Sequence, residues 1–164
     1  MNPRRPGFAF LPVLLALAGC GFHLQGLSRL PPSFASTYLE AEDHYTDFNR
    51  AMLEDLRAAG SRVVGAGEEA GATVEILTDD SGQHVLSVSA NNTPTEYEVY
   101  YTVKYRVRIG AREVLAPTTL TQTRNYSFDE NAILAKEQEQ EIIRRALAHD
   151  IAALVVRRLA AVSP

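Results

Sequence analysis

Five basic side chains lie close together in a part of the chain that could bind an anion. Residues 99–128 carry these five cations against a single acid, and the cations are Lys104, Arg106, Arg108, Arg112 and Arg124. Arginine binds phosphate through a planar fork of donors and lysine binds it as a point charge. Neighbouring Tyr and Val side chains could contact alkyl chains. The pattern indicates either a site for an anionic amphiphile or a solvated sheet face, where Lys and Arg also protect strand edges from aggregation.

No arrangement of residues in the sequence predicts catalysis. The four histidines are scattered, and none has a two-histidine metal spacing such as H-E-x-x-H. Asp79, Asp80 and His84 could form a weak ion site, but a polar hairpin turn explains them better. A G-x-S-x-G context and a glycine-rich phosphate loop are both absent from the sequence. We therefore expect no enzymatic activity, no metal site and no cofactor.

The only cysteine follows a sequence typical of an export signal. Two arginines precede an apolar run at residues 7–18, which is too short to span a membrane. The stretch Leu17-Ala18-Gly19-Cys20 resembles the lipobox of bacterial lipoproteins, in which the cysteine is acylated and the signal is cut before it. We expect a signal peptide at residues 1–19 and a lipid anchor at Cys20, and Gly21 favours the outer membrane as the destination. The alternative is a plain secretory signal or a buried hydrophobic N-terminus with an incidental cysteine.

The overall charge conceals a strong local asymmetry. The chain of 164 residues has a formal charge of −4, and cleavage before Cys20 would remove two arginines and no acid. Residues 36–98 carry three basic and 13 acidic residues, next to the basic segment at residues 99–128. The acidic balance argues against a general nucleic-acid binder. A local basic strip still leaves room for one phosphorylated lipid.

Alternation of apolar and polar residues predicts the strands that position these cations. In residues 96–109, Tyr and Val side chains share one face, and the polar side chains, including Lys104, Arg106 and Arg108, share the other. A polar stretch at residues 79–82 is predicted to be a turn or a bulge. The remaining strands are expected at residues 37–41, at residues 73–77 and 85–89 on either side of this stretch, which count as one strand of the fold, and at residues 118–128.

Two helices are predicted by apolar residues at three- and four-residue spacing. Residues 46–59 place Phe48, Met52 and Leu56 on one helix face, and Gly60 is a suitable C-terminal cap. A second helix follows the capping-box sequence Ser127-Phe128-Asp129-Glu130. Its apolar stripe consists of Ile143, Leu147, Ile151 and Leu154 with Val155, Leu159 and Val162, and Glu141 and Arg145 have favourable i,i+4 spacing.

The order of these elements, β-α-β-β-β-α, predicts an α+β fold. We expect a two-layer sandwich of a mostly antiparallel four-stranded sheet with two helices on one face. The basic stripe would then lie on the other face. Residues 20–35, which contain two consecutive prolines, are interpreted as a lipidated tether, and residues 36–162 as a single domain.

Three groups of residues form an ordered set along the chain. The first is Cys20-Gly21-Phe22-His23-Leu24, directly after the lipobox, and the second is Thr95-Glu96-Tyr97. The third is Arg124 to Phe128, followed by Ala132-Ile133-Leu134-Ala135-Lys136. In this order they resemble the CG[FW]HL start, the EY motif and the R-x-x-F…ALAK passage of the LPS-assembly lipoprotein family LptE. The resemblance covers most of the mature chain.

The resemblance implies a non-catalytic protein of the outer membrane, lipid-anchored at Cys20, with its domain in the periplasm or in a barrel lumen. Members of the family form a translocon with the β-barrel LptD, which they plug and help to assemble, and they bind lipopolysaccharide on its way to the outer leaflet. The alternative is a lipoprotein that binds another envelope ligand, or an unrecognised envelope hydrolase.

The resemblance also implies where lipopolysaccharide would bind. A lysine at the start of the C-terminal helix is associated with this binding in the family, and it falls on Lys136. Family members can carry a basic residue in the hairpin before the EY motif, whereas residues 90–92 are neutral here. The binding site would therefore either depend more on Lys104, Arg106 and Arg124 or bind more weakly. The candidate residues are Lys136, Lys104, Arg106, Arg124 and Arg108.

Overall fold

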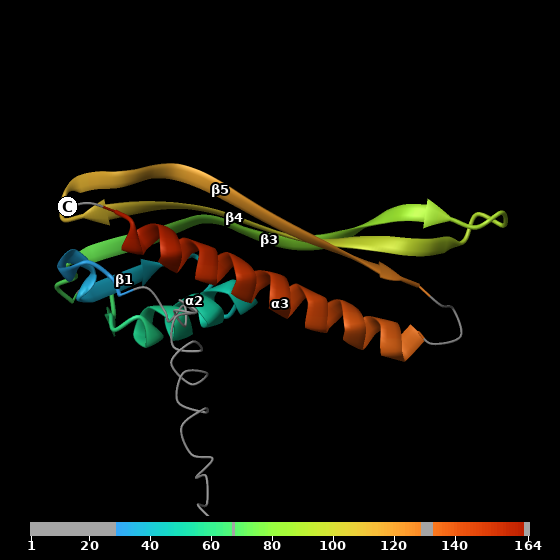
Figure 1. The fold of residues 1–164 in the computed structure, drawn as a ribbon, viewed down its shortest axis with the longest axis horizontal. Coiled ribbons are helices and arrows are strands. Elements are labelled where there is room, and N and C mark those ends of the chain that lie inside the picture. The colour runs from blue at the N-terminus through green and yellow to red at the C-terminus, as the bar shows by residue number, and fades with distance from the viewer. Residues whose placement is uncertain (1–28, 67, 129–132, 163–164) are drawn as a thin grey trace, which may run out of the picture.

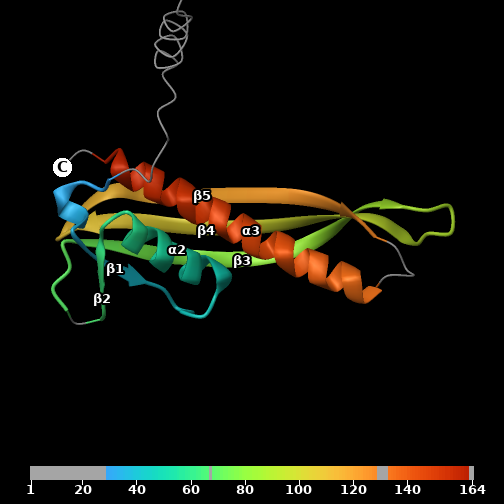
Figure 2. The ribbon, with the colours of Figure 1, turned by 60° about the horizontal axis from the view of Figure 1, so that its bottom comes forward.

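The computed structural model describes residues 29–66, 68–128 and 133–162 and shows two layers. A five-stranded sheet forms one layer, and two helices, α2 and α3, cover one of its faces (Figures 1 and 2). The elements are η1 (Pro32–Phe34), β1 (Ser36–Glu40), α2 (Asp47–Ala58), β2 (Arg62–Val64), β3 (Ala72–Val88), β4 (Pro94–Ile109), β5 (Arg112–Ser127) and α3 (Ile133–Ala160). Cys20 and the predicted signal peptide lie outside the described residues.

The sheet is mixed and has five strands, so the prediction of four mostly antiparallel strands was correct in class but incomplete. Its order is β2-β1-β3-β4-β5, and β1 runs parallel to both β2 and β3. The strand that the sequence analysis missed, β2, has only three residues and therefore shows no periodicity. Helix α2 connects β1 to β2, and such a crossover is what parallel neighbouring strands require.

Strand β3 is continuous over 17 residues and passes through residues 79–82, so the turn that the sequence left open there, as one alternative to a bulge, is not formed. Residues 79–82 pair one to one with residues of β4. A register shift lies just before them, between Ile76 and Thr78. Gly82 lies directly beneath the ring of Tyr100, where an added Cβ would come within 2.7 Å of the tyrosine hydroxyl. The glycine therefore permits close strand packing here and does not mark a turn.

The predicted two-faced strand is confirmed in β4. Val99, Tyr101, Val103, Tyr105 and Val107 are all buried beneath the helices. The polar residues between them lie on the face of the sheet that no helix covers (Figure 1). This alternation fixes which side of the sheet each β4 side chain occupies.

Helix α2 begins and ends close to the predicted residues. Its N-cap is Thr46, whose hydroxyl accepts a hydrogen bond of 3.0 Å from the backbone N–H of Asn49. Phe48, Met52 and Leu56 are fully buried. Gly60, just beyond the helix, has a φ of 90°, a conformation that glycine adopts without strain.

Helix α3 packs against α2, β4 and β5. Its predicted apolar stripe is buried at Ile143, Leu147, Ile151, Val155 and Leu159. The predicted pair of Glu141 and Arg145 is present at 3.5 Å. Part of the predicted capping box, residues 129–130, lies outside the described residues.

The hairpin of β3 and β4 extends past the start of α3, beyond the helix layer (Figure 1). At the opposite end of the domain, Phe34 in η1 is fully buried in the core. The molecule therefore has a thick, well-packed end and a thin end that consists of a hairpin.

Candidate functional site

The uncovered sheet face carries three of the predicted cations, Lys104, Arg106 and Arg108, from β4. Arg106 lies opposite Glu75 of β3 in the strand register. Its Nε and Nη2 atoms donate hydrogen bonds of 2.8 and 2.7 Å to the two oxygens of that carboxylate. This bidentate geometry is the strong form of an arginine–carboxylate pair.

Arg108 extends the pair into a four-residue cluster. Its Nη2 lies 3.1 Å from Glu40 of β1 and 3.3 Å from Glu75. The hydrogen bond from Arg106 is the main reason why the pKa of Glu75 lies below its usual value of 4.5. Two arginines and two glutamates therefore balance each other, and this half of the predicted basic stripe carries little net charge. The sequence analysis overlooked this because Glu40 and Glu75 lie far away along the chain.

Lys104 differs from its two neighbours because no ion pair in the described part of the chain neutralises it. Its register partners are Thr78 on β3 and Thr119 on β5, and its side chain is exposed. The hydroxyls of Thr102 and Thr121 lie 3.0 Å apart on the same face. Lys104 is thus an exposed cation beside hydroxyl groups, and Asp80, opposite Thr102 in the strand register, lies on the same face.

Arg124 lies on the opposite side of the sheet, so the predicted stripe is not one surface. Its register partner is Val99, which is buried beneath the helices. The guanidinium of Arg124 reaches Asp150 of α3 at 3.5 Å. Since paired residues on neighbouring strands share a face, Arg124 cannot contact the same ligand group as Lys104.

Lys136 lies near the start of α3, as the resemblance placed it. Its ammonium is 2.8 Å from the carboxylate of Glu139, three residues further along the helix. Lys136 and the other candidate cations are therefore dispersed over the uncovered face, the helix-covered face and the helix itself.

Exposed apolar side chains gather at the thin end of the domain. Val85, Leu86 and Val88 in the projecting part of β3 are each about half exposed. Leu134, in the first turns of α3 at the same end of the molecule, is 77% exposed (Figure 1). A cluster of exposed apolar side chains is typical of an interaction site. The adjacent apolar residues Val85 and Leu86 break strict alternation, which is the only signal of this patch in the sequence.

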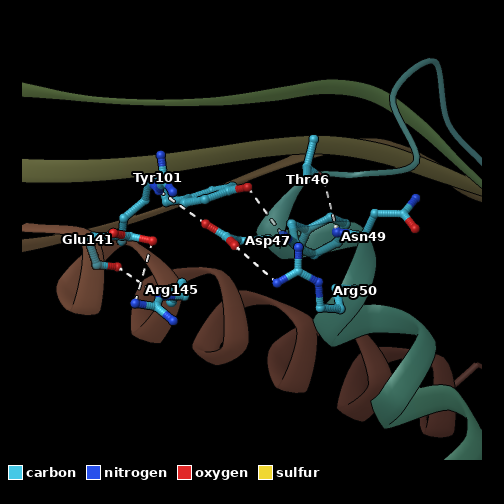
Figure 3. Close-up of polar contacts among 9 residues, drawn as sticks. Thr46, Asp47, Asn49, Arg50, Tyr101, Glu141 and Arg145 are labelled. Atoms are coloured by element: carbon cyan, nitrogen blue, oxygen red, sulfur yellow. Dashed lines mark hydrogen bonds and ion pairs between the residues drawn. The ribbon is translucent and has the colours of Figure 1, made fainter.

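A polar junction between α2, α3 and β4 lines an open pocket of about 380 Å³, and Figure 3 shows several of the side chains that line it. The carboxylate of Asp47 lies 3.0 Å from Nε of Arg144 and 3.8 Å from Arg50. The hydroxyl of Tyr101 accepts a hydrogen bond of 3.2 Å from the backbone N–H of Phe48. Burial is the main cause that raises the pKa of Tyr101 far above its usual range, so the hydroxyl stays protonated. This junction fixes the start of α2 against the sheet and α3.

The weak ion site considered for Asp79, Asp80 and His84 is not assembled. Asp79 and Asp80 point to opposite faces of β3 because they are adjacent in the strand. The imidazole of His84 stacks on Tyr100, with ring centroids 4.7 Å apart. Across residues 29–66, 68–128 and 133–162, no group of His, Cys, Asp and Glu side chains is arranged to hold a metal ion. The same residues contain no helix that is both long and apolar enough to cross a membrane.

A family model and several known proteins match almost the whole folded domain. Residues 34–159 match the family model described as "LptE: Lipopolysaccharide-assembly". The chain is 28% identical over 147 residues to the LPS-assembly lipoprotein LptE of Pectobacterium atrosepticum, covering 89% of this chain and 79% of that protein. The same identity and length are found with LptE of Yersinia enterocolitica, of which 70% is covered.

Two solved structures share the fold. A lipoprotein B from Nitrosomonas europaea superposes with a TM-score of 0.71 at 24% identity, over 86% of this chain and 91% of that one. The rare lipoprotein B from Shewanella oneidensis superposes with a TM-score of 0.67 at 25% identity, over 77% and 94% of the two chains.

Proposed function

Because this chain belongs to the LptE family of lipopolysaccharide-assembly proteins, we propose that it is the outer-membrane lipoprotein that works with the β-barrel LptD. The observation that carries this proposal is the family match over residues 34–159, which includes both helices and all five strands. The protein is not an enzyme, in keeping with its family. Its role is to assemble and transport lipopolysaccharide without chemical change.

A two-layer domain with one uncovered polar sheet face suits a position inside a barrel. The lumen of a large outer-membrane barrel is polar, and a plug must therefore present polar side chains to it. The cluster of Arg106, Arg108, Glu40 and Glu75 and the hydroxyl pair of Thr102 and Thr121 supply such a surface. Since the cluster balances its own charges, Arg106 and Arg108 can enter a crowded lumen without adding an unpaired ion, and Lys104 is the cation of this strand face that stays available to a ligand.

Attachment to the membrane is assigned to Cys20, which follows the lipobox sequence. A single acyl chain gives only reversible attachment, whereas a multiply acylated cysteine anchors a protein stably. Residues 21–28 would then connect the anchor to the described domain.

Among the candidate cations, Lys104 and Lys136 are the ones that we assign to lipopolysaccharide phosphates. Lys104 is exposed, and no carboxylate of the described residues pairs with it. Among the described residues, Lys136 pairs with Glu139 alone, an i,i+3 contact whose strength is small on a helix surface. It lies at the end where Val85, Val88 and Leu134 are exposed. A cation next to exposed apolar side chains suits a lipid that combines phosphates with acyl chains.

The partnership with LptD is tested by affinity purification of the tagged full-length chain from detergent-solubilised outer membranes. We expect LptD to be recovered in an amount comparable to the bait. A tagged outer-membrane lipoprotein of another family is the control for non-specific recovery. If the bait is recovered from the membrane and LptD is absent, the proposed function is wrong.

A further inference from the structure

Strand β5 forms one edge of the sheet and is much longer than the strand at the opposite edge. Across residues 29–66, 68–128 and 133–162, β4 is the one strand that pairs with β5. β5 extends over 16 residues, whereas β2, at the other edge, has three. An edge strand presents a row of backbone N–H and C=O groups with which another strand can pair. A long stretch of β5 is therefore open to an added strand.

The strand register identifies the backbone groups of β5 that bond to β4. Phe128 follows the register pair of Ser127 and Glu96, and its N–H donates a hydrogen bond of 2.9 Å to the carbonyl of Thr95. Hydrogen-bonded and non-hydrogen-bonded pairs alternate along an antiparallel ladder. Every second residue of β5, counted back from Phe128, therefore bonds to β4 as far as Thr118, beyond which the register shifts.

The residues between these direct their backbone N–H and C=O groups away from β4, and we call those groups the free edge. They belong to Thr119, Thr121, Thr123, Asn125 and Ser127. The hydroxyls of Thr102 and Thr121 lie 3.0 Å apart, which agrees with this assignment because side chains approach most closely in non-hydrogen-bonded pairs. All five residues are also exposed.

The middle of β5 lacks the features by which proteins protect long strand edges. Such features include charged side chains, proline and very short strands. Residues 118–123 contain no charged residue, proline or glycine, and Pro117 lies just before them. The opposite edge strand, β2, is short and begins with an arginine, as the protective pattern requires. An unprotected stretch in one edge of a native sheet indicates that another strand covers it.

We propose that the free edge of β5 pairs with an extended segment of the barrel partner, which becomes a sixth strand of the sheet. This inference rests on the proposed function, because it assigns part of the contact surface between the two proteins. The outward N–H and C=O groups recur at every second residue, at intervals of about 6.8 Å, a repeat that an extended polypeptide matches. Main-chain hydrogen bonds of this kind are a common way in which sheet edges bind extended segments.

The two faces of β5 indicate which side chains the segment carries. On the uncovered face, the segment lies beside Thr119, Thr121 and Thr123, which suit small or polar side chains. On the other face it lies beside Leu120, which packs against the core, and an apolar side chain there extends the core. Alternation of polar and apolar side chains is characteristic of the strands of outer-membrane barrels. The chemistry of this edge therefore favours a segment of the barrel.

A second copy of this chain fits the same edge less well. On the helix-covered face, β5 itself carries Thr118, Gln122 and Arg124, whose side chains are polar. Pairing of two β5 strands would therefore add few apolar contacts beside Leu120. Self-pairing would also be detectable in the isolated protein, which distinguishes it from binding of the partner.

Hydrogen exchange of backbone amides tests the pairing in the full-length protein, both alone and in the complex purified with LptD. Electron-transfer fragmentation resolves the exchange of single amides. We expect the N–H groups of Thr119, Thr121 and Thr123 to exchange rapidly in the isolated protein and at least about tenfold more slowly in the complex. The N–H groups of Leu120 and Gln122, which bond to β4, should be protected in both states and serve as the internal control.

Thr121→Pro removes one outward donor, and proline is tolerated in an edge strand where its missing N–H would face solvent. Thr121→Ala is the matched control, because it keeps the N–H but also loses the hydroxyl contact with Thr102. Each variant is co-expressed with wild type under a different tag, and both proteins are quantified in the complex purified through LptD. We expect the proline variant to be depleted roughly threefold to tenfold, as loss of one hydrogen bond predicts, and the alanine variant to be incorporated like wild type.

Three outcomes would overturn the proposal. One is exchange of the free-edge amides that is as fast in the complex as in the isolated protein, and another is equal incorporation of wild type and folded Thr121→Pro. The third is slow exchange of these amides already in the isolated protein, which would mean that a second copy, or residues outside the described part of the chain, occupy the edge. If thermal unfolding shows that Thr121→Pro does not fold, hydrogen exchange of the wild type decides. Recovery of LptD without protection of the free edge leaves the proposed function intact, whereas absence of LptD overturns both.

Discussion

Arg106 and Glu75 face each other across β4 and β3 and form two hydrogen bonds, of 2.8 and 2.7 Å. The Glu75 side chain is only 16% exposed, so the pair is shielded from solvent on one side. Arg108 joins it at 3.3 Å, so that one carboxylate serves two guanidinium groups. The sequence predicts a basic stripe here. In the structure, Arg106 and Arg108 are instead balanced by Glu75 and Glu40, so half of this stripe is a charge-balanced network.

Glu75→Gln should lower the free energy of unfolding by about 1 kcal/mol at pH 7. Because the folded protein holds the pKa of Glu75 below 4.5, the stabilisation is complete above that pH and is lost as the pH falls through the lowered pKa. The difference between wild type and variant should therefore shrink in acid. Urea unfolding between pH 3 and 7 measures it, with Glu69→Gln as a control on an exposed acid that lies outside this network. A difference that stays constant with pH would contradict this account.

Lys104→Asp should weaken lipopolysaccharide binding severalfold without changing thermal stability, because this exposed lysine has no ion pair among the described residues. Binding of purified lipopolysaccharide to the full-length protein measures the effect. Arg62→Asp introduces the same change of charge at an exposed position of the edge strand β2 and should leave binding nearly unaltered. Equal losses in both variants would mean that only net charge matters. Arg106→Asp is less informative because it also leaves Glu75 without its main partner.

Tyr101→Phe should cost about 1–3 kcal/mol of stability, since the buried N–H of Phe48 would lose its acceptor at the start of α2. Denaturant unfolding is the measurement. Tyr45→Phe is the control, because that tyrosine is 89% exposed and its loss should change stability by less than about 0.5 kcal/mol. If the two variants are equally stable, the hydrogen bond to Phe48 does not hold α2 in place.

Val85→Ser combined with Val88→Ser should leave stability nearly unchanged, because both side chains are about half exposed. The double variant should nevertheless bind lipopolysaccharide more weakly, while binding of inorganic phosphate is unaffected. A parallel loss of both would indicate that the hairpin itself is misfolded, and far-UV circular dichroism would detect that. Retention of full lipopolysaccharide binding would remove the projecting hairpin from the proposed site.

Cys20→Ala should abolish acylation and release the protein from the membrane fraction, or leave it with its signal peptide uncleaved. Intact mass measurement distinguishes these forms from the acylated protein. A variant that stays membrane-bound with an acyl mass would contradict the lipobox interpretation of residues 17–20.

Local patterns were sufficient to predict most of the elements. The face of β4 that carries Val99, Val103 and Val107 and the end of α2 before Gly60 both follow from nearby residues, and both are confirmed. Strand β2 was missed because three residues cannot show a period. The sequence could not decide between a turn and a bulge at residues 79–82, because Gly82 is also a common turn residue. In the folded strand this glycine passes beneath Tyr100.

The sequence by itself determined the class of fold, the alternation of β4 and the family, because these depend on the order and spacing of residues along the chain. Only the tertiary structure decided which cations are free. Glu75 neutralises Arg106 through a strand register that brings together residues 31 positions apart, and Arg124 turns to Asp150 on the helix-covered face. An electrostatic site depends on distances between charges in space, and strand register and helix packing fix those distances only when the chain folds.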